Sequence, residues 1–370
     1  MKMEKIEQQL TIHLDQKPIY NILFEQDFLN LKDALKNLGY ENRKLLIVTE
    51  TNVAPLYLEK IKEVLEPMFR EIVCFTFQAG EKQKQLSTVS QIYTTLIEHQ
   101  FDRKDILLAL GGGVTGDLTG FAAATYLRGV DFVQVPTSLL AQVDSSIGGK
   151  TGVDYESYKN MVGAFYQPSL VYINTSTLKT LPEKEFISGL GEVIKHGLIK
   201  DRDYFHWIKE HKEEIKNRKV EVLQEMIYRS CQIKGAVVER DPKEQGERAL
   251  LNFGHTLGHS IEKLMDFSML HGDCVVIGSE LASFISWKRG LISKEEQKEI
   301  QELFAYFHFD PLPTNIDPEE IVKATKLDKK MEQGQIKFIL LKRIGEAFID
   351  KTVTEEEMLF SLSCYGGAKS

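Results

Sequence analysis

The sequence predicts an α/β fold, with an N-terminal domain on a parallel sheet and a mostly α-helical C-terminal domain. The first observation behind this prediction is that short β-rich runs alternate with helical patterns over residues 1–175. Such alternation is typical of parallel strands joined by crossover helices. The second is that long amphipathic segments dominate after about residue 176, where β-rich runs become rare. We therefore expect two domains, at residues 1–175 and 176–370.

Four runs of the buried-strand type divide the first half of the chain. Each of the first three leads into a helical pattern, and the third does so through a cluster of glycines. The segment 11–24 before them predicts two antiparallel edge strands around a turn, and 336–349 is the one later hairpin candidate. The four runs are KLLIVTE (44–50), EIVCFTFQ (71–78), DILLAL (105–110) and DFVQVP (131–136).

Composition excludes several classes of protein. Apolar residues make up 42% of the 370 residues and charged residues 27%, with a net charge of −8, which fits a globular protein and argues against a nucleic-acid binder. Because no stretch of about 18 uninterrupted apolar residues occurs, we expect no membrane span. The N-terminus lacks the apolar run of a secretory signal, and four scattered cysteines are typical of free thiols, so we expect a cytoplasmic protein.

The glycine cluster at 111–113 ends one predicted strand and opens a helix. Glycines there let the backbone approach a pyrophosphate, and the helix N-terminus supplies N–H donors. A tight turn alone would not require three consecutive glycines, so the cluster favours a dinucleotide site, although its spacing is not G-x-G-x-x-G. Asn52, Glu81 and Lys84 follow the two preceding strands, and we expect them to line the same ligand edge.

The GGKT stretch at 148–151 resembles the end of a phosphate-binding P-loop. Such a loop needs a glycine six positions before its lysine, and here that position is Asp144. The residues before it, LLAQVD, also indicate a helical turn rather than a strand. We therefore exclude a P-loop. Lys150, Lys159 and Asn160 instead form a polar cluster that suits a polyhydroxylated, anionic substrate.

Histidines gather in the second half of the chain. His255 and His259 stand four residues apart on one predicted helix, and His271 follows shortly after. The spacing resembles a metal clamp but lacks the glutamate of H-E-x-x-H. With these nitrogen ligands and one carboxylate, zinc is the default metal. Spacing does not decide which two histidines would bind it.

Six blocks of sequence, taken in order, resemble the 3-dehydroquinate synthase family, whose members are sugar-phosphate cyclases related to the iron-dependent alcohol dehydrogenases. The resemblance extends from about Asn52 to Asp328-Lys329-Lys330. Ser138 stands where the family more often has Thr, and Gly191 where it often has Ala. The blocks are GGGVTGDLTGFAAATYLRGV, VQVPTSLLAQVDSSIGGKTGV, KNMVGAFYQP, LPEKEFISGLGEVIKHGLI, RALLNFGHTLGHSIE and LHGD.

This resemblance implies the conversion of 3-deoxy-D-arabino-heptulosonate 7-phosphate to 3-dehydroquinate and phosphate, a step of the shikimate pathway. The reaction would proceed by NAD-dependent oxidation, phosphate elimination, reduction and intramolecular aldol closure. The resemblance further implies an N-terminal Rossmann-like domain that binds NAD and a helical C-terminal domain that binds the metal and the substrate. It also implies one divalent metal ion, zinc or cobalt, and a homodimer.

The family's functional residues have counterparts in this sequence. The implied metal ligands are Glu192, His255 and His271, which makes His259 a contact for the substrate phosphate. The implied catalytic residues are Lys150, Asp144, Lys195, Asn160, Glu244, Arg248 and His259. The implied NAD contacts are Asn52, Glu81, Lys84, Gly112, Gly113, Asp117, Thr137, Ser138, Lys159, Thr180 and Glu185. Further substrate contacts are Arg128, Lys234, Asn252 and one of Lys329 and Lys330, with Lys330 preferred.

Three other functions compete with this one. A related cyclase that makes an inosose or valiolone skeleton would share the fold, NAD and the metal. A glycerol-type dehydrogenase would produce net NADH, and a non-catalytic NAD-binding protein would need few of the ligands and lysines. The set Arg128, Asp144, Asn160 and Arg248 favours a substrate that carries a carboxylate.

Overall fold

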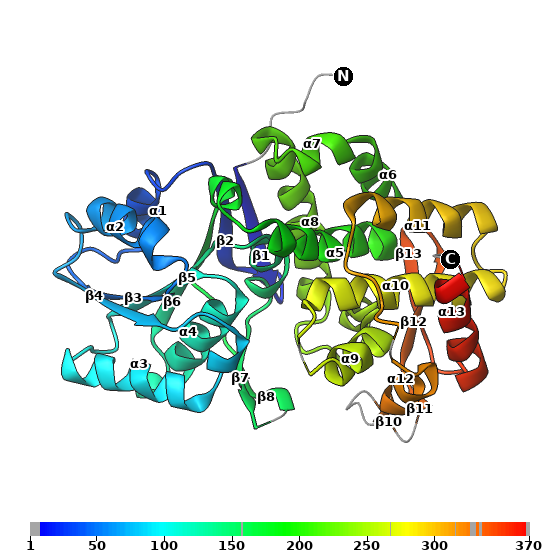
Figure 1. Ribbon diagram of the computed structural model, residues 1–370. Coiled ribbons are helices and arrows are strands. Elements are labelled where there is room, and N and C mark those ends of the chain that lie inside the picture. The colour runs from blue at the N-terminus through cyan, green and yellow to red at the C-terminus, as the bar shows by residue number, and fades with distance from the viewer. Residues whose placement is uncertain are drawn as a thin grey trace. The chain divides into compact units, whose positions relative to one another are not determined.

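A computed structural model of the protein describes residues 8–156, 158–266, 268–314, 316–325, 331–332 and 335–367 (Figure 1). By internal packing the chain divides into two compact units. The first unit contains the described residues up to Leu181 together with Leu223–Glu239, and the second contains Pro182–Val222 and the described residues from Arg240 onward. The segment 223–239, which lies in the predicted second domain, therefore packs with the first unit.

The first unit is built on a seven-stranded sheet, which confirms the predicted α/β fold class. Its strand order is β1-β2-β9-β6-β5-β3-β4. All neighbouring strands run parallel except β1 and β2, the antiparallel pair expected at 11–24. The strands are β1 (Gln9–Leu14), β2 (Lys17–Glu25), β3 (Lys44–Glu50), β4 (Glu71–Phe77), β5 (Ile106–Gly111), β6 (Asp131–Pro136) and β9 (Leu170–Asn174).

Both faces of this sheet are covered by helices, as Figure 1 shows for α1 and α2 on one side and α3 and α4 on the other. Alternate residues of β3 pack into opposite layers. Leu45 and Ile47 lie in the core beneath α1 and α2, and Leu46 and Val48 in the core beneath α3 and α4. Burial on both faces explains why these strands are continuous apolar runs. The helices are α1 (Leu31–Asn37), α2 (Ala54–Leu65), α3 (Leu86–Glu98) and α4 (Gly113–Thr125).

An antiparallel hairpin that sequence patterns did not predict follows β6 in the first unit. It consists of β7 (Lys150–Tyr155) and β8 (Tyr158–Phe165). Gly152 and Gly163 are register partners, and a Cβ atom on Gly163 would lie 2.3 Å from the carbonyl oxygen of Thr151. The close approach of the two strands therefore requires glycine. The hairpin carries Lys150 at its start and Lys159 and Asn160 on its second strand.

The second unit is mostly helical, as expected. Its later hairpin, β12 (Phe338–Arg343) with β13 (Glu346–Asp350), confirms the candidate at 336–349. Two short strands, β10 (Met331–Glu332) and β11 (Gln335–Ile336), pair with each other. The helices are α5 (Glu183–Lys200), α6 (Arg202–Glu210), α7 (Lys212–Lys216), α9 (His255–Leu264), α10 (His271–Lys288), α11 (Lys294–Phe307), α12 (Pro318–Thr325) and α13 (Glu355–Gly367).

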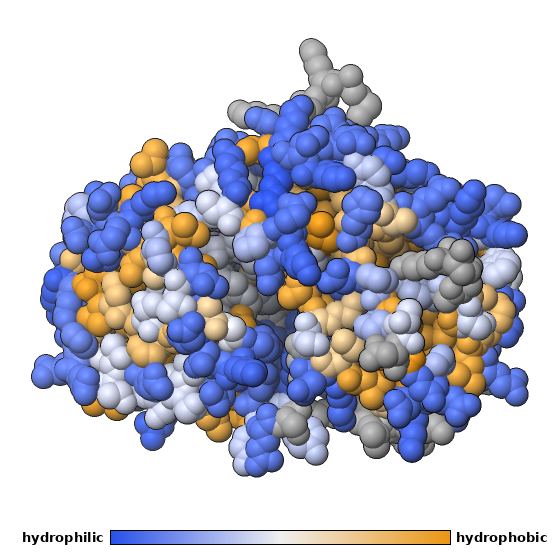
Figure 2. Space-filling view, viewed as in Figure 1, coloured by the Kyte–Doolittle hydropathy of each residue, from blue (hydrophilic) through white to orange (hydrophobic). Residues whose placement is uncertain are grey.

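Helix α8 (Val220–Arg240) has most of its length in the first unit. The amide of Gln224 donates to the carbonyl of Phe24 in β2, and a Cβ atom on Gly235 would lie 2.8 Å from Ile12 in β1. These contacts are why α8 groups with the sheet rather than with the other helices. Among the described residues, no helix is long and apolar enough to cross a membrane. On the face shown in Figure 2, hydrophilic and hydrophobic residues are interspersed.

Candidate functional site

The glycine turn of the first unit joins β5 to α4. Gly112 is the N-cap residue of α4 and has an extended backbone, and no side chain caps the helix by a hydrogen bond. A Cβ atom on Gly113 would lie 3.1 Å from the Ser145 hydroxyl, and one on Gly112 would lie 3.4 Å from the Ser138 hydroxyl. The turn therefore places Gly112, Gly113 and Ser138 together beside backbone N–H groups that can bind an anion. The N–H of Thr137 donates to the carbonyl of Gly111 at 2.9 Å, so Thr137 lies at the same turn.

An ionic cluster around the buried Lys84 brings together five more of the predicted residues. The Lys84 ammonium lies 2.6 Å from a carboxylate oxygen of Asp117 and donates to the side-chain oxygen of Asn160 at 2.6 Å. Lys159 lies 3.7 Å from the carboxylate of Glu81. Burial acts to lower the pKa of Lys84, but Asp117 and Glu81 outweigh it and raise the pKa above its ordinary value. Lys84 is therefore a fixed cation.

Asp154 supports this cluster, although sequence reasoning did not select it. Its N–H donates to the carbonyl of Lys84, and its carboxylate accepts the N–H of Asn160, both at 2.7 Å. Asn160 has a φ of +53°, an uncommon backbone conformation for a residue other than glycine. Such conformations concentrate at functional sites. The hydrogen bonds from Asp154 show how the fold holds Asn160 in this conformation.

A second ion pair of the first unit joins the predicted substrate contacts Asp144 and Lys234. The Lys234 ammonium donates at 2.5 Å to both the backbone carbonyl and the carboxylate of Asp144. Asp144 lies in a π-helical turn, η3 (Ala141–Ser145), where the sequence predicts a helical turn. The amide of Gln142 anchors that turn through the carbonyls of Pro136 and Asn174. π-Helical turns are rare and are frequent at functional sites.

Three more predicted residues of the first unit have other neighbours. Arg128 is exposed, with a φ of +68°, beyond the far end of α4 and about 20 Å along that helix from Gly112. Asn52 follows β3 and donates its N–H to Glu50 at 2.6 Å. The hydroxyl of Thr180 contacts that of Tyr57 at 2.5 Å. The structure therefore does not bring Arg128 to the glycine turn or to Lys84.

In the second unit, glycines let three helices touch through their backbones (Figure 1). A Cβ atom on Gly272 in α10 would lie 1.9 Å from the carbonyl of Ser188 in α5, and one on Gly191 would lie 2.8 Å from the carbonyl of Gly272. A Cβ atom on Gly278 in α10 would lie 1.8 Å from the carbonyl of Gly254, the N-cap residue of α9. No other residue type would fit at these contacts without displacing backbone. This packing brings polar side chains of α5, α9 and α10 close to one another.

Three side chains from those helices converge on one point. A carboxylate oxygen of Glu192 lies 3.7 Å from Nε2 of His255 and 3.7 Å from Nε2 of His271. Ligand atoms about 2.0–2.1 Å from a zinc ion are roughly 3.3 Å apart at a tetrahedral angle, so these separations fit one ion. Glu192 and His255 are buried. Two imidazole nitrogens and one carboxylate oxygen are a donor set that zinc accepts with a coordination position left open.

His259 and Lys195 border the same point. The nitrogens of His255, His259 and His271 lie within 4.8 Å of one another, so geometry alone also permits a three-histidine set. The Lys195 ammonium contacts the other oxygen of Glu192, and Lys195 is almost fully buried. The helices therefore place a cation directly beside the candidate metal ligands.

The loop before α9 gathers three further predicted residues. The amide of Asn252 donates to Glu244 at 2.7 Å, and the guanidinium of Arg248 donates to the carbonyl of Pro242 at 2.7 Å. Glu244 has a φ of +57°. Asp241, which sequence reasoning missed, holds the loop because its carboxylate accepts the N–H groups of residues 245, 246 and 248. Burial acts to raise the pKa of Asp241, but these N–H groups lower it below its ordinary value.

Glu185 lies in the first turn of α5 and is exposed, and Lys329 and Lys330 lie outside the described residues. Glu262, near the end of α9, is a second residue that the sequence reasoning missed in this unit. Its carboxylate lies 3.6 Å from Nδ1 of His271. The spacing H-x-x-x-H-x-x-E, seven residues from His255 to Glu262, is the signal that would have selected it, because residues at that spacing share a helix face.

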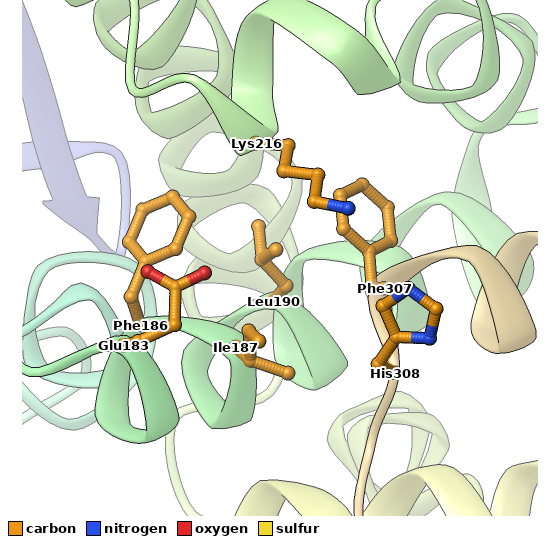
Figure 3. A pocket seen from close by; sticks show the side chains of 7 residues that line it. All are labelled: Glu183, Phe186, Ile187, Leu190, Lys216, Phe307 and His308. Atoms are coloured by element: carbon orange, nitrogen blue, oxygen red, sulfur yellow. The ribbon is translucent and has the colours of Figure 1, made fainter.

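A cavity of about 210 Å³ lies on another side of α5 (Figure 3). Its α5 residues follow one helix face, and Glu192 lies about half a turn around from Leu190, the last of them. None of the lining residues is a predicted site residue, so we assign the chemistry to the polar clusters rather than to this cavity. It is lined by Glu183, Phe186, Ile187, Leu190, Lys216, Phe307 and His308.

Comparison with known proteins gives a consistent result. Residues 74–188 match the family model for the 3-dehydroquinate synthase N-terminal region, and residues 189–331 match that for the C-terminal region. The 3-dehydroquinate synthase of Nitrosomonas europaea is 45% identical over 93% of each chain. That of Nitrosospira multiformis is 47% identical over 85% of this chain and 86% of its own.

Solved structures also match this chain, and we describe a neighbour that is similar in both fold and sequence. It is 2-epi-5-epi-valiolone synthase from Streptomyces hygroscopicus subsp. jinggangensis 5008, with NAD+ and Zn2+ bound. It superposes with a TM-score of 0.88 at 27% identity, covering 94% of this chain and 97% of its own. The fold described above is therefore also that of a sugar-phosphate cyclase.

Proposed function

The chain belongs to the 3-dehydroquinate synthase family, whose activity the sequence matches assign to it, and we propose that it works with one NAD and one divalent metal ion. The ion would be held by Glu192, His255 and His271. The observation that carries this proposal is that one carboxylate oxygen of Glu192 lies 3.7 Å from Nε2 of each histidine. The relative bound to NAD+ and Zn2+ supports it.

NAD would lie against the first unit. Its pyrophosphate fits the glycine turn at Gly112 and Gly113, where backbone N–H groups and the start of α4 favour an anion. The cluster around Lys84 and Asp117 would bind polar groups of the cofactor through positions that its internal hydrogen bonds already fix. Thus NAD would meet a preformed surface.

The substrate's phosphate and carboxylate would be bound by the basic side chains of this acidic protein. Lys150, Lys234 and Arg248 supply cations, and arginine can bind a carboxylate or phosphate with two parallel hydrogen bonds. His259 would contact the phosphate. Asn160 and Asn252 would orient hydroxyl groups by hydrogen bonds. These contacts hold the reacting carbons in place while phosphate leaves and the ring closes.

When bound, the metal ion acts as a Lewis acid on a substrate hydroxyl, and NAD accepts and returns a hydride. Glu192 and Lys195 are in contact, so the lysine also offsets the carboxylate's charge when no ion is bound. Lys195 would then turn its ammonium toward a substrate oxygen. Asp144 keeps Lys234 oriented through both its carboxylate and its carbonyl.

Phosphate release from 3-deoxy-D-arabino-heptulosonate 7-phosphate, with and without chelator, tests the proposal. We expect release that stops on chelation and returns on adding zinc or cobalt. A sugar phosphate that lacks the carboxylate should react far more slowly. If only that second compound reacts, the chain is a related cyclase of the valiolone type. If chelation has no effect, the metal assignment is wrong.

We further propose that the enzyme is a homodimer, as the family resemblance implies. Light scattering coupled to size exclusion gives the mass in solution directly. A mass of two chains supports the proposal, and a mass of one chain contradicts it.

A further inference from the structure

We propose that Glu262 is a positioning residue for the metal site, because its carboxylate faces Nδ1 of His271 at 3.6 Å and can hold the ring with Nε2 toward Glu192. The inference rests on the metal site proposed above. Glu262 is not itself a ligand in this account. It acts through His271.

The placement of Glu262 follows from the geometry of α9. His255, His259 and Glu262 stand at positions i, i+4 and i+7, so one helix face presents all three. The Glu262 side chain is 5% exposed, and its oxygen lies 3.6 Å from Nδ1 of His271. On the other side of the same ring, Nε2 lies 3.7 Å from Glu192. The imidazole of His271 therefore lies between two buried carboxylates, one facing each nitrogen.

These positions determine which tautomer is useful. A neutral imidazole carries its proton on one nitrogen and binds a metal through the other. An acceptor beside Nδ1 favours the Nδ1–H form and leaves the Nε2 lone pair for the ion. A carboxylate acceptor also makes the ligand nitrogen more basic. Ionised Glu262 can do both.

His255 provides an internal comparison. Its Nδ1 lies 3.1 Å from the backbone carbonyl of Phe253, so the main chain can fix its tautomer. His271 is the first residue of α10 and depends on a side chain from another helix for the same purpose. The two histidine ligands thus obtain the same orientation from different sources. Only the acceptor beside His271 is a side chain, so only that acceptor can be removed by substitution.

The test compares two variants with a matched control. Glu262→Gln keeps a neutral acceptor of the same size, and Glu262→Leu keeps the volume but removes the acceptor. The control is Glu280→Gln, a buried carboxylate on α10 that accepts a hydrogen bond from Gln301 at 2.8 Å. The dissociation constant for Zn2+ or Co2+ is measured by chelator competition on the full chain, together with the thermal midpoint of the metal-free protein.

We expect Glu262→Leu to weaken metal binding by about 10–100-fold and Glu262→Gln by less, since the loss of an outer partner of a histidine ligand costs this much. Glu280→Gln should bind metal as the parent does. In a His271→Ala background, Glu262→Gln should produce no further loss. The visible spectrum of the Co2+ form should change in Glu262→Gln and not in Glu280→Gln.

A metal affinity equal to the parent's in both Glu262 variants overturns the inference. So does an equal loss in Glu280→Gln, because that result would indicate a general effect of removing buried charge. If Glu262→Leu does not fold, Glu262→Gln decides alone. If the parent chain binds neither Zn2+ nor Co2+, the metal site of the proposed function is wrong, and the role proposed for Glu262 is wrong as well.

Discussion

The two units use charge in opposite ways. In the first unit, the charged residues of the site are already paired, as Lys84 is with Asp117 and Lys234 with Asp144. In the second, two imidazole nitrogens and a carboxylate oxygen, all lone-pair donors, converge on one point. The first arrangement has its charges matched within the protein, and the second directs lone pairs at a point where a metal ion would fit. Replacing a proposed ligand in the second unit should therefore change metal binding, and removing one member of a buried pair in the first should change stability.

Glycine also has a different role in each unit. At the turn between β5 and α4 it leaves backbone N–H groups accessible beside Ser138 and Ser145. Between α5, α9 and α10 it lets backbones touch, as at Gly272 and Gly278. The same residue type thus creates room for a ligand in one unit and brings ligand-bearing helices together in the other.

Glu192→Gln should give the largest effect, because it replaces the one carboxylate among the proposed ligands. We expect loss of stoichiometric metal and a fall in metal affinity greater than the about 10–100-fold typical of an outer partner. The metal-free protein should also lose stability, because Lys195 is then buried without the carboxylate that it contacts. Metal analysis after dialysis provides the measurement, with Glu280→Gln as the control. Full metal content in Glu192→Gln would contradict the ligand set.

Lys150→Ala should lower turnover by about 10²–10⁴-fold, the range for a residue that acts directly on the reacting groups. NAD affinity should stay at the parent value, because Lys150 is assigned to the substrate. Stopped assays of phosphate release and NAD titration give the two numbers. Lys36→Ala, an exposed lysine on α1, serves as the control. Unchanged turnover, or a parallel loss of NAD binding, would show that this assignment is wrong.

Lys84→Met should destabilise the first unit by about 3–5 kcal/mol, because it leaves Asp117 buried without its cation. Denaturant unfolding measures the loss. Adding Asp117→Asn to Lys84→Met should recover part of it, since the uncompensated charge is then removed. Lys62→Met, which breaks an exposed pair with Glu59, should leave stability unchanged. If the double variant recovers nothing, the pairing does not account for the loss.

Much of this architecture could be predicted from the sequence. The run 44–50 is β3 and 131–136 is β6, because strands buried on both faces are recognisable as apolar runs. The β7–β8 hairpin could not be found that way. Its strands mix polar and apolar residues without a continuous apolar run, and their pairing depends on contact between glycines at 152 and 163. That contact is not visible in local sequence.

The site was predictable to a similar degree. The i, i+4 spacing showed that His255 and His259 share a helix face, but it could not show that His271 joins them. That contact arises from the packing of α10 on α9 through Gly254 and Gly278. Asp241 was missed for a related reason. Its role is to bind backbone N–H groups of its own loop, and residue type alone does not reveal this.

The smallest expected effect is a pH dependence of stability. It arises from an ion pair that belongs neither to the proposed NAD site nor to the proposed metal site. Arg289 donates two hydrogen bonds to Glu357, at 2.6 and 2.7 Å, and these lower the pKa of Glu357 to about 2. Since the folded pKa lies below the ordinary value of 4.5, the pair stabilises the protein fully above about pH 5 and loses its effect as the pH falls toward 2.

Arg289→Leu should therefore cost about 1–3 kcal/mol at neutral pH, after allowance for the partial exposure of the pair, and almost nothing near pH 2. Denaturant unfolding of both proteins across this range measures the difference. A difference that does not change with pH would contradict the assigned pKa.

The most direct test of the central claim follows phosphate and NADH absorbance in one reaction with a trace of NAD. The account predicts that phosphate accumulates to many times the amount of NAD while no NADH remains, because the hydride taken from the substrate is returned to it. Phosphate release that matches lasting NADH, or NADH without phosphate, would contradict it and indicate a dehydrogenase.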